Sequence, residues 1–255
     1  MNEKPIIRVE HLTTGYGHSV IMEDISFDVY KGEIFGILGG SGCGKSTVLK
    51  NMIGLTKPFS GRIWIDEDDI VLAEGKQKVS IWNRIGVMYQ QSALFGSMSL
   101  LENVRLPLEE FTDLPLPIMN EIVMTKLKMV GLFPFAHLSP SELSGGMKKR
   151  AAIARAMAMD PEIIFLDEPS AGLDPITSVE LDYLIIRLSR TLGVTFVIVT
   201  HELPSVFTMA DRVIVLDKSK KGIIAEGKPK DLKEKSKDPF VRQFFNRIPQ
   251  ESTPL

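Results

Sequence analysis

Gly39 to Thr47 reads GGSGCGKST and directly follows the apolar run Glu33 to Leu38 (EIFGIL). Gly39 to Ser46 matches the pattern G-x-x-x-x-G-K-[ST]. A short continuous apolar run before a Gly-rich turn predicts a strand that is buried on both faces. The residues from Lys45 to Gly54 predict a helix that ends at Gly54. A strand, a loop and a helix in this order are typical of a phosphate-binding loop.

The residue types in this loop suit the binding of phosphate groups. Glycines let the backbone N–H groups of Gly42, Gly44 and Lys45 approach phosphate oxygens, where a Cβ would obstruct them. Lys45 supplies a mobile cation for β- and γ-phosphates, and Ser46 supplies a hydroxyl for Mg²⁺. The loop therefore predicts a site for a nucleoside triphosphate and a magnesium ion.

A second motif, in the other half of the chain, ends in two acidic residues that could act at the same site. Ile163 to Leu166 (IIFL) predicts a buried strand that ends in Asp167 and Glu168. Ligands bind at the carboxyl ends of strands in open α/β sheets. We expect Asp167 to approach Mg²⁺ and Glu168 to polarise the attacking water. The alternative is that these carboxylates merely cap the strand end, because DEP triplets are also ordinary turns.

Helix and strand patterns alternate around these motifs. Predicted helices at 146–159 and 175–192 alternate with strands at 162–167 and 194–200, which is the pattern of a parallel sheet. The spacing from Leu100 to Leu132 is helical and predicts a helical lobe between the two halves of the sheet, with interruptions expected at Pro107, Pro115 and Pro117. The remaining predicted strands are 6–9, 20–29 and 61–65, and a turn-like stretch covers 66–78.

Composition excludes several classes of protein. The chain has 255 residues, 44% of them hydrophobic, a net charge of −2 and one cysteine. It is therefore neither disordered nor a disulfide scaffold. Mixed charges predict no nucleic-acid partner. We find no secretory signal and no run of about 20 apolar residues, so we expect an intracellular chain that does not itself span a membrane. The lysine-rich segment 218–237 predicts a solvated face, with a membrane-surface contact as the alternative.

A third motif, Leu143 to Met147 (LSGGM), stands before an Ala-rich helix. With the phosphate loop and the acidic strand, the sequence from Ile6 to about Gly227 resembles the ATP-binding cassette family, the nucleotide-binding subunits of ABC transporters. The resemblance implies an α/β fold: a P-loop NTPase with a RecA-like core and a parallel sheet, an N-terminal antiparallel β subdomain and an inserted α-helical lobe. It implies one ATPase domain over 1–240, with the lobe at about 92–150, and a short tail over 241–255.

The resemblance also implies roles for single residues. Tyr16 matches the aromatic residue that stacks on adenine, and Gln90 matches the residue that touches the metal and couples to the membrane subunit. Asp174 ends the D-loop (SAGLD), and His201 matches the switch histidine at the γ-phosphate. The implied catalytic residues are Lys45, Gln90, Glu168 and His201, and the implied metal-site residues are Ser46, Gln90 and Asp167. The implied ATP-binding residues are Tyr16, Gly39, Gly40, Ser41, Gly42, Cys43, Gly44, Lys45, Ser46 and Thr47.

In this family the signature completes the site of a second subunit. Ser144, Gly145 and Gly146 start a predicted helix, whose N-terminus can hold phosphate oxygens. The resemblance therefore implies a homodimer that closes on two ATP molecules. Met147 departs from the glutamine that most members carry there. That departure puts in doubt any amide contact to the partner's nucleotide, while the serine and glycine donors remain.

The LSGGM variant points to a subgroup. With Tyr89 to Val104, Asp167 to Thr177 and Asp238 to Phe244, it resembles the Mla-type lipid-asymmetry ATPases, which work with MCE-domain proteins. This resemblance implies phospholipid transport, a multi-span permease and a peripheral place on the cytoplasmic face of the inner membrane. Leu94, Phe95 and Met98 are the candidate permease contact, and lobe core is the alternative assignment for them.

Other functions remain open at this point. A soluble ATPase of the same family, such as an iron–sulfur assembly factor, is one alternative, and the motor of a transporter for another substrate is a second. DNA-repair members carry long coiled coils between the loop and the signature, whereas this chain has no sustained heptads there. A purely structural nucleotide-binding module conflicts with the presence of both Glu168 and His201.

Overall fold

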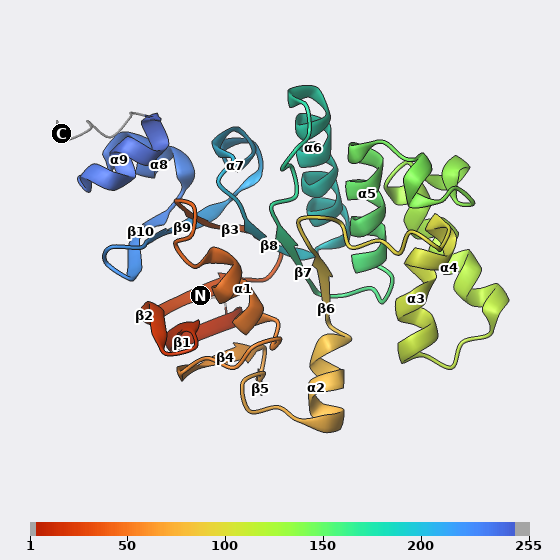
Figure 1. Ribbon diagram of the computed structural model, residues 1–255, viewed down its shortest axis with the longest axis horizontal. Coiled ribbons are helices and arrows are strands. Elements are labelled where there is room, and N and C mark those ends of the chain that lie inside the picture. Colours follow the sequence, from red (N-terminus) through yellow and green to blue (C-terminus); the bar gives the residue numbers. More distant parts are fainter. Residues whose placement is uncertain (1–3, 248–255) are drawn as a thin grey trace.

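The computed structural model describes residues 4–247, which form two sheets flanked by helices (Figure 1). The smaller sheet is antiparallel, with the strand order β2-β1-β4-β5. Its strands are β1 (Pro5–Tyr16), β2 (Ser19–Tyr30), β4 (Ser60–Ile65) and β5 (Asp68–Asp69). Long β1 and β2 pair along their whole length as a hairpin, and this sheet is the expected N-terminal antiparallel subdomain.

The larger sheet contains the phosphate loop and the acidic strand, in the order β10-β9-β3-β8-β7-β6. All its neighbouring pairs are parallel except β9 with β10. Its strands are β3 (Ile34–Gly39), β6 (Ile85–Met88), β7 (Ile163–Asp167), β8 (Thr195–Val199), β9 (Arg212–Asp217) and β10 (Gly222–Gly227). The predicted α/β fold with a mostly parallel sheet is confirmed, since β3 and β7 lie in one sheet with β8 between them.

Helices cover both faces of this sheet and build the lobe (Figure 1). In the lobe, α3, α4 and α5 pack on one another, and α6 and α7 pack together beside the sheet. The helices are α1 (Lys45–Met52), α2 (Gly75–Trp82), α3 (Leu100–Phe111), α4 (Leu116–Met129), η1 (Phe133–Phe135), η2 (Pro140–Glu142), α5 (Gly145–Ala156), α6 (Pro175–Leu192), α7 (Leu203–Met209), α8 (Pro229–Lys235) and α9 (Pro239–Asn246).

Alternation along the buried strands divides the apolar core between the two faces of the sheet. Ile163 and Phe165 of β7 join the core toward the antiparallel sheet, whereas Ile164 and Leu166 join the core of the lobe. Successive side chains of a strand point to opposite faces, so a strand between two layers must be apolar throughout. A third cluster, which includes Val241 and Phe245, holds α9 against α7 and β9.

Two local predictions need correction. Pro107 lies inside α3 and does not interrupt it. The capping box of Ser99 and Glu102 starts this helix, and the burial of Leu100, Val104 and Leu108 offsets the proline's cost of about 3 kcal/mol. The second correction concerns 66–78, which contains β5 and the start of α2 besides turns.

The C-terminal part of the chain is more ordered than a tail. The boundary expected after residue 240 falls within α9, whose Val241 and Phe245 are buried. The rest of the expected tail, 248–255, lies outside the described residues. Within 218–237, Lys220 pairs with Asp238 (2.8 Å) and Lys235 pairs with Asp231 (2.6 Å).

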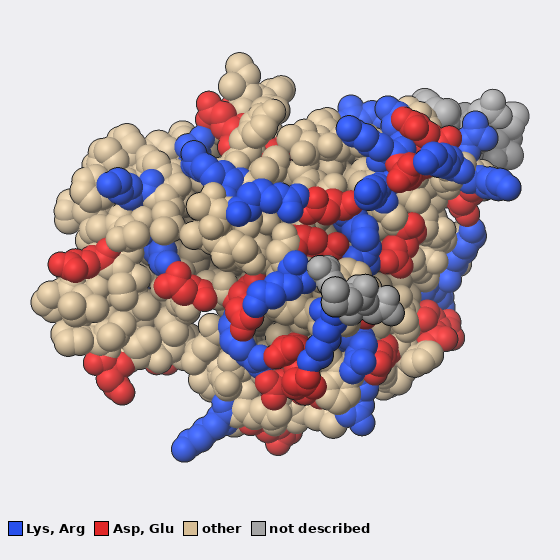
Figure 2. Space-filling model, turned by 180° about the vertical axis from the view of Figure 1, so that it is seen from behind, with Lys and Arg blue, Asp and Glu red and all other residues tan. Residues whose placement is uncertain are grey.

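The charges on the surface are mixed in sign. In the view from behind, Lys and Arg side chains are interspersed with Asp and Glu (Figure 2). Across residues 4–247, no helix combines the length and the apolarity needed to cross a membrane. The structure therefore shows neither a broad single-sign field on that face nor a helical span among the described residues.

Candidate active site

The loop between β3 and α1 has a backbone that glycine makes possible. Gly42 and Gly44 have φ of 69° and 105°, and a Cβ on Gly44 would lie 2.7 Å from the Ile21 side chain. Lys45 reaches back across the loop, and its Nζ donates to the carbonyls of Gly39 (3.0 Å) and Gly40 (3.1 Å). The loop thus holds an ammonium group beside the N-terminus of α1, where anions are stabilised.

Two of the three residues expected at the metal, Ser46 and Asp167, meet across the sheet. Ser46 Oγ donates to Asp167 Oδ1 at 3.3 Å, although 121 positions separate them in the sequence. Burial raises the pKa of Asp167, and the hydrogen bond from Ser46 acts against that rise. A hydroxyl and a carboxylate side by side are oxygen ligands of the kind Mg²⁺ takes, so this pair fits a magnesium ion.

Glu168 and His201 form the second pair at this edge of the sheet. Glu168 is buried, and its Oε1 lies 2.7 Å from His201 Nδ1 while its Oε2 accepts from Thr200 Oγ1 at 3.1 Å. Its φ of 47° places it in the left-handed region, which is uncommon for a residue other than glycine. The carboxylate therefore has a fixed direction, as a general base requires.

A cavity of about 560 Å³ lies between the phosphate loop and the Glu168–His201 pair, and Asp167 does not line it. The expected residues that line it are Gly39, Gly40, Ser41, Gly42, Lys45, Ser46, Gln90, Glu168 and His201. Three further lining residues were missed: Leu203, Phe244 and Arg247. Phe244 and Arg247 come from the end of α9, and no local pattern in the sequence connects that helix with the phosphate loop.

Tyr16, Cys43 and Thr47 lie apart from the walls of this cavity. Tyr16 lines a smaller hollow of about 210 Å³ on the outer side of the loop, together with Gly44 and Thr47. Thr47 Oγ1 donates to the Tyr16 hydroxyl at 2.8 Å. The Cys43 side chain is buried in the core, and burial raises the pKa of its thiol. Any contact of Cys43 with a ligand is therefore left to its backbone.

Lys149 is a buried cation that the sequence analysis missed. Its Nζ donates to the carbonyl oxygens of Gln90 (2.5 Å) and Glu168 (3.2 Å), so one side chain ties together two segments of the cavity. Burial lowers the pKa of Lys149, and the nearby carboxylates of Glu168 and Asp167 partly offset this. The residue lies in the charged run Lys148 to Arg150, and lysine is almost never fully buried unless it is paired.

The signature lies outside the cavity of its own chain. Ser144 caps α5 by accepting from Met147 N (3.3 Å), and a Cβ on Gly146 would lie 2.4 Å from Thr177 Cγ2. Asp174 caps α6 in the same way, by accepting from the N–H groups of Ile176 and Thr177. Neither Ser144 nor Gly145 lines the phosphate cavity. Met147 packs its side chain on the core of the lobe.

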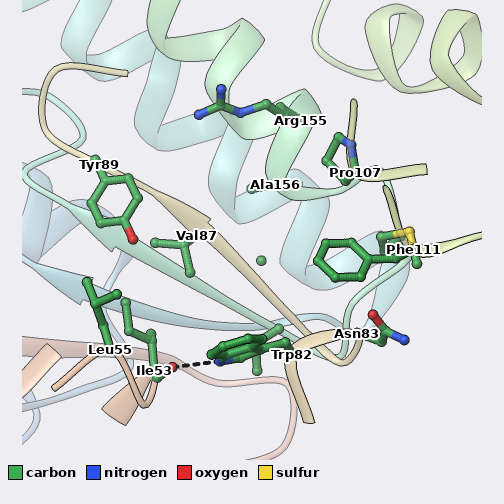
Figure 3. A pocket seen from close by; sticks show the side chains of 13 residues that line it. Ile53, Leu55, Trp82, Asn83, Val87, Tyr89, Pro107, Phe111, Arg155 and Ala156 are labelled. Atoms are coloured by element: carbon green, nitrogen blue, oxygen red, sulfur yellow. Dashed lines mark hydrogen bonds between the residues drawn. The ribbon is translucent and has the colours of Figure 1, made fainter. Parts of the chain in front are cut away.

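A second hollow, of about 360 Å³, separates the lobe from the sheet (Figure 3). Trp82 and Tyr89 line one side, and Pro107 and Phe111 of α3 line the other. Arg155, which also lines it, donates to the carbonyls of Ser92 and Ala93, just before Leu94 and Phe95. Of the expected permease contacts, Phe95 is 49% exposed, while Leu94 and Met98 are half-buried and line neither cavity.

A phosphate loop, a strand ending in two carboxylates and a paired histidine at one sheet edge define a P-loop ATPase. Comparison with known proteins gives the family. The family described as ABC transporter matches residues 22–171, and the chain belongs to it. It is the ATP-binding subunit, and the ATPase, of an ABC transporter.

Two relatives are equally similar to this chain. The probable ribonucleotide transport ATP-binding protein mkl of Mycobacterium leprae is 42% identical over 240 residues, which cover 94% of this chain and 68% of mkl. The intermembrane phospholipid transport system ATP-binding protein MlaF of Escherichia coli is 42% identical over 239 residues, which cover 94% of this chain and 88% of MlaF.

Solved structures share the fold. The structure of cbiO1 from Clostridium perfringens, part of the ABC transporter complex cbiONQ, has a TM-score of 0.83 at 32% identity and covers 97% of both chains. The ATP-binding cassette MJ0796, in a dimeric post-hydrolysis state bound to ADP and Pi, has a TM-score of 0.78 at 31% identity and covers 87% of this chain and 98% of its own.

Proposed function

We propose that this chain works as a homodimer on the cytoplasmic face of the inner membrane, where it powers phospholipid movement through a permease that acts with an MCE-domain protein. The observation that carries the dimer is that the site is incomplete. One chain brings the phosphate loop, Glu168 and His201 together around the 560 Å³ cavity, while its signature at Ser144 lies outside that cavity. A second copy would supply the missing helix N-terminus.

The residues predicted from the sequence have distinct roles in this proposal. Lys45 and the backbone N–H groups of the loop bind the β- and γ-phosphates, and Ser46, Asp167 and Gln90 hold Mg²⁺. A magnesium ion bound there would supply positive charge that neutralises the phosphates. Glu168 accepts a proton from the attacking water, and His201 orients Glu168 and faces the γ-phosphate. The supporting geometry is that Lys45, Ser46, Gln90, Glu168 and His201 line one cavity, while Asp167 contacts Ser46.

The remaining proposed contacts are those with adenine and those made by the partner copy. Tyr16 stacks on adenine beside the outer face of the loop, where 53% of it is exposed. Ser144, Gly145 and Gly146 hold phosphate oxygens bound to the partner copy, and Asp174 fixes the start of α6 at the same interface. The domain boundaries expected from the sequence belong to this proposal, with α9 counted as part of the ATPase domain because its apolar side packs on α7.

The hollow between lobe and sheet is the proposed permease contact. Its walls carry exposed aromatic side chains, Trp82 (37%) and Phe111 (43%), beside a loop that also exposes Phe95. Exposed apolar side chains around a hollow are typical of a surface that binds another protein. ATP-driven closure of the dimer would move this surface, and with it a bound permease.

Phospholipid is the proposed cargo because the likeness to MlaF extends over 88% of that protein's length and because this chain carries LSGGM, the variant on which its resemblance to the Mla-type subgroup rests. The equal identity to mkl supports a ribonucleotide as the second candidate. The test is a strain that lacks this chain. Altered phospholipid distribution between membranes, restored by the parent chain and not by a Lys45→Ala chain, supports the proposal. Normal lipid distribution together with lost nucleotide uptake supports the second candidate.

A further inference from the structure

Three residues with a left-handed backbone belong to the two loops that bring Glu168 and Gln90 to the cavity, and none of them is glycine. Their φ angles are 47° at Glu168, 63° at Ser92 and 49° at Ala93. Such conformations are unfavourable for residues that carry a Cβ, and they persist where neighbouring groups hold the backbone in place. The groups that hold these three residues therefore help to set the geometry of the site.

One helix donates a side-chain hydrogen bond to the carbonyl of each of the three. Lys149 Nζ, on α5, bonds the Glu168 carbonyl at 3.2 Å. Arg155, on the same helix, bonds the carbonyls of Ser92 at 3.1 Å and Ala93 at 2.7 Å. A cation of α5 is thus hydrogen-bonded to every one of these strained backbone positions.

Lys149 reaches both loops, and its hydrogen bonds go to their main chain. Its Nζ also donates to the Gln90 carbonyl at 2.5 Å. The side chains of Gln90 and Glu168 line the cavity, whereas Lys149 does not. Lys149 is 6% exposed, and a buried ammonium loses hydration that two carbonyls replace only in part. Since an apolar side chain would avoid this cost, the buried charge calls for a functional explanation.

The helix that carries Lys149 starts at the signature. Ser144 caps α5, and Lys149 is the fifth residue of the helix. Under the proposed function, the N-terminus of α5 faces the nucleotide of the partner copy. Lys149 therefore joins a helix that serves the partner's site to the base of its own site.

We propose that Lys149 is a positioning residue for ATP hydrolysis, which holds Glu168 in its left-handed conformation and fixes it relative to Gln90. Without the ammonium, the Glu168 carbonyl keeps the N–H of Ala171 (3.2 Å) as its donor. The backbone of Glu168 can then relax, and its carboxylate loses the direction that a general base needs. Phosphate binding depends instead on the loop around Lys45, so it should persist. The inference rests on the proposed role of Glu168 and on the proposed dimer.

The first test is Lys149→Met, which keeps the length of the side chain and removes its charge and its donors. In Mg²⁺-ATP hydrolysis its kcat should be about 10-fold lower than the parent's, with KM for ATP within about twofold. Added to Glu168→Gln, it should cause no further loss of kcat, because it acts through the base. Lys126→Met is the matched control: Lys126 is 4% exposed on α4 and pairs with Asp160, so kcat should stay within about twofold of the parent's.

Mixed dimers separate positioning from damage to the signature helix. When Lys45→Ala chains are mixed with Ser144→Arg chains, the intact site of each mixed dimer takes Glu168 from the Ser144→Arg chain and its signature from the Lys45→Ala chain. Lys149→Met should therefore lower the activity of the mixture about 10-fold when the Ser144→Arg chain carries it. It should leave that activity unchanged when the Lys45→Ala chain carries it, because that chain supplies only its signature to the intact site.

A second variant, Lys149→Gln, keeps two N–H donors on a shorter, uncharged side chain, so its kcat should lie between those of Lys149→Met and the parent. Thermal unfolding checks that the variants are folded, and Lys149→Gln replaces Lys149→Met in the mixtures if the latter is not. The inference is overturned if kcat of Lys149→Met stays within about twofold of the parent's, if Lys126→Met loses as much, or if the change lowers activity from the Lys45→Ala chain. No activity in the original mixture, or parent-like turnover by Glu168→Gln, would instead overturn the proposed dimer or the proposed base.

Discussion

Lys45 and Glu168 both line the cavity, but their hydrogen bonds suit them to different roles. Lys45 is bound to two loop carbonyls and has no carboxylate partner among the ion pairs of the described residues. Glu168 is fixed by His201 and Thr200. The first arrangement suits a cation that exchanges carbonyls for phosphate oxygens, and the second suits a base that must not move.

Lys45→Ala should abolish ATP hydrolysis and weaken ATP binding at least about 10-fold, because no other cation of the described chain lines the phosphate cavity except Arg247 at its rim. Nucleotide affinity and phosphate release measure both effects. Lys57→Ala, which removes an exposed lysine paired with Glu74, serves as the control and should behave like the parent. Unchanged turnover in Lys45→Ala would remove the loop from the site.

Glu168→Gln should keep ATP binding and slow hydrolysis by at least about 100-fold, since the amide preserves shape and loses basicity. The trapped ATP-bound protein should elute as a dimer when it is sized with ATP and Mg²⁺. Glu162→Gln, at the opposite end of β7, is the matched control. A Glu168→Gln protein that is monomeric with ATP and turns over at the parent rate contradicts both the base and the dimer.

At the scale of elements, the lobe exposes several large aromatic side chains to solvent. Phe95, Phe111 and Phe133 are all more than a third exposed. Of these three, only Phe111 lines the hollow between the lobe and the sheet. Phe95 lies two residues after Ala93, whose carbonyl accepts a hydrogen bond from Arg155 in the wall of that hollow. These phenylalanines therefore have different surroundings in the structure, although they look alike in the sequence.

Phe95→Asp should release the chain from membranes that contain its permease, because a charge at an apolar contact must be desolvated without a partner. Sedimentation with membranes, compared with ATP affinity, measures the effect, and the affinity should stay within about twofold of the parent. Phe133→Asp is matched in exposure, at 49% for both residues, and lies on η1 away from the hollow. Equal release by both variants, or by neither, would argue against this docking surface.

At the scale of the whole molecule, the phosphate loop and the signature lie in different parts of the same chain. In Figure 1 the phosphate loop precedes α1 near the antiparallel sheet, whereas the signature starts α5 beside the lobe. No rotation of a side chain can bring Ser144 to Lys45, because separate elements of the core hold each of them. Under the proposed function, a complete site therefore requires two copies.

Mixing Ser144→Arg chains with Lys45→Ala chains should restore activity that neither has alone. In a mixed dimer one composite site carries both defects and the other carries none, so turnover of up to about half the parent's rate per dimer is expected if the sites act independently. ATPase assays on mixtures in which mixed dimers have been demonstrated measure this. No recovery in such a mixture would contradict independent sites completed in trans.

Much of this protein could be predicted from local sequence. The phosphate loop, the acidic strand and the signature are short, and their chemistry depends on residue types at fixed spacing, so Lys45, Ser46, Asp167 and Glu168 were found without coordinates. The alternation of apolar strands and helices likewise predicted the parallel sheet, because the periodicity of burial is a local property. The strand β9 and the helix α9 were missed, since their partners lie far away in the chain.

Contacts between distant segments were decided by the tertiary structure alone. The 3.3 Å contact of Ser46 with Asp167 spans 121 positions, and the pairing of Glu168 with His201 depends on β7 and β8 being neighbours in the sheet. The burial of Lys149, and the arrival of Phe244 and Arg247 at the cavity, depend on how helices pack. Residue types and spacing determine which chemistry a segment can perform, while packing determines which segments meet, because burial is a property of the whole chain.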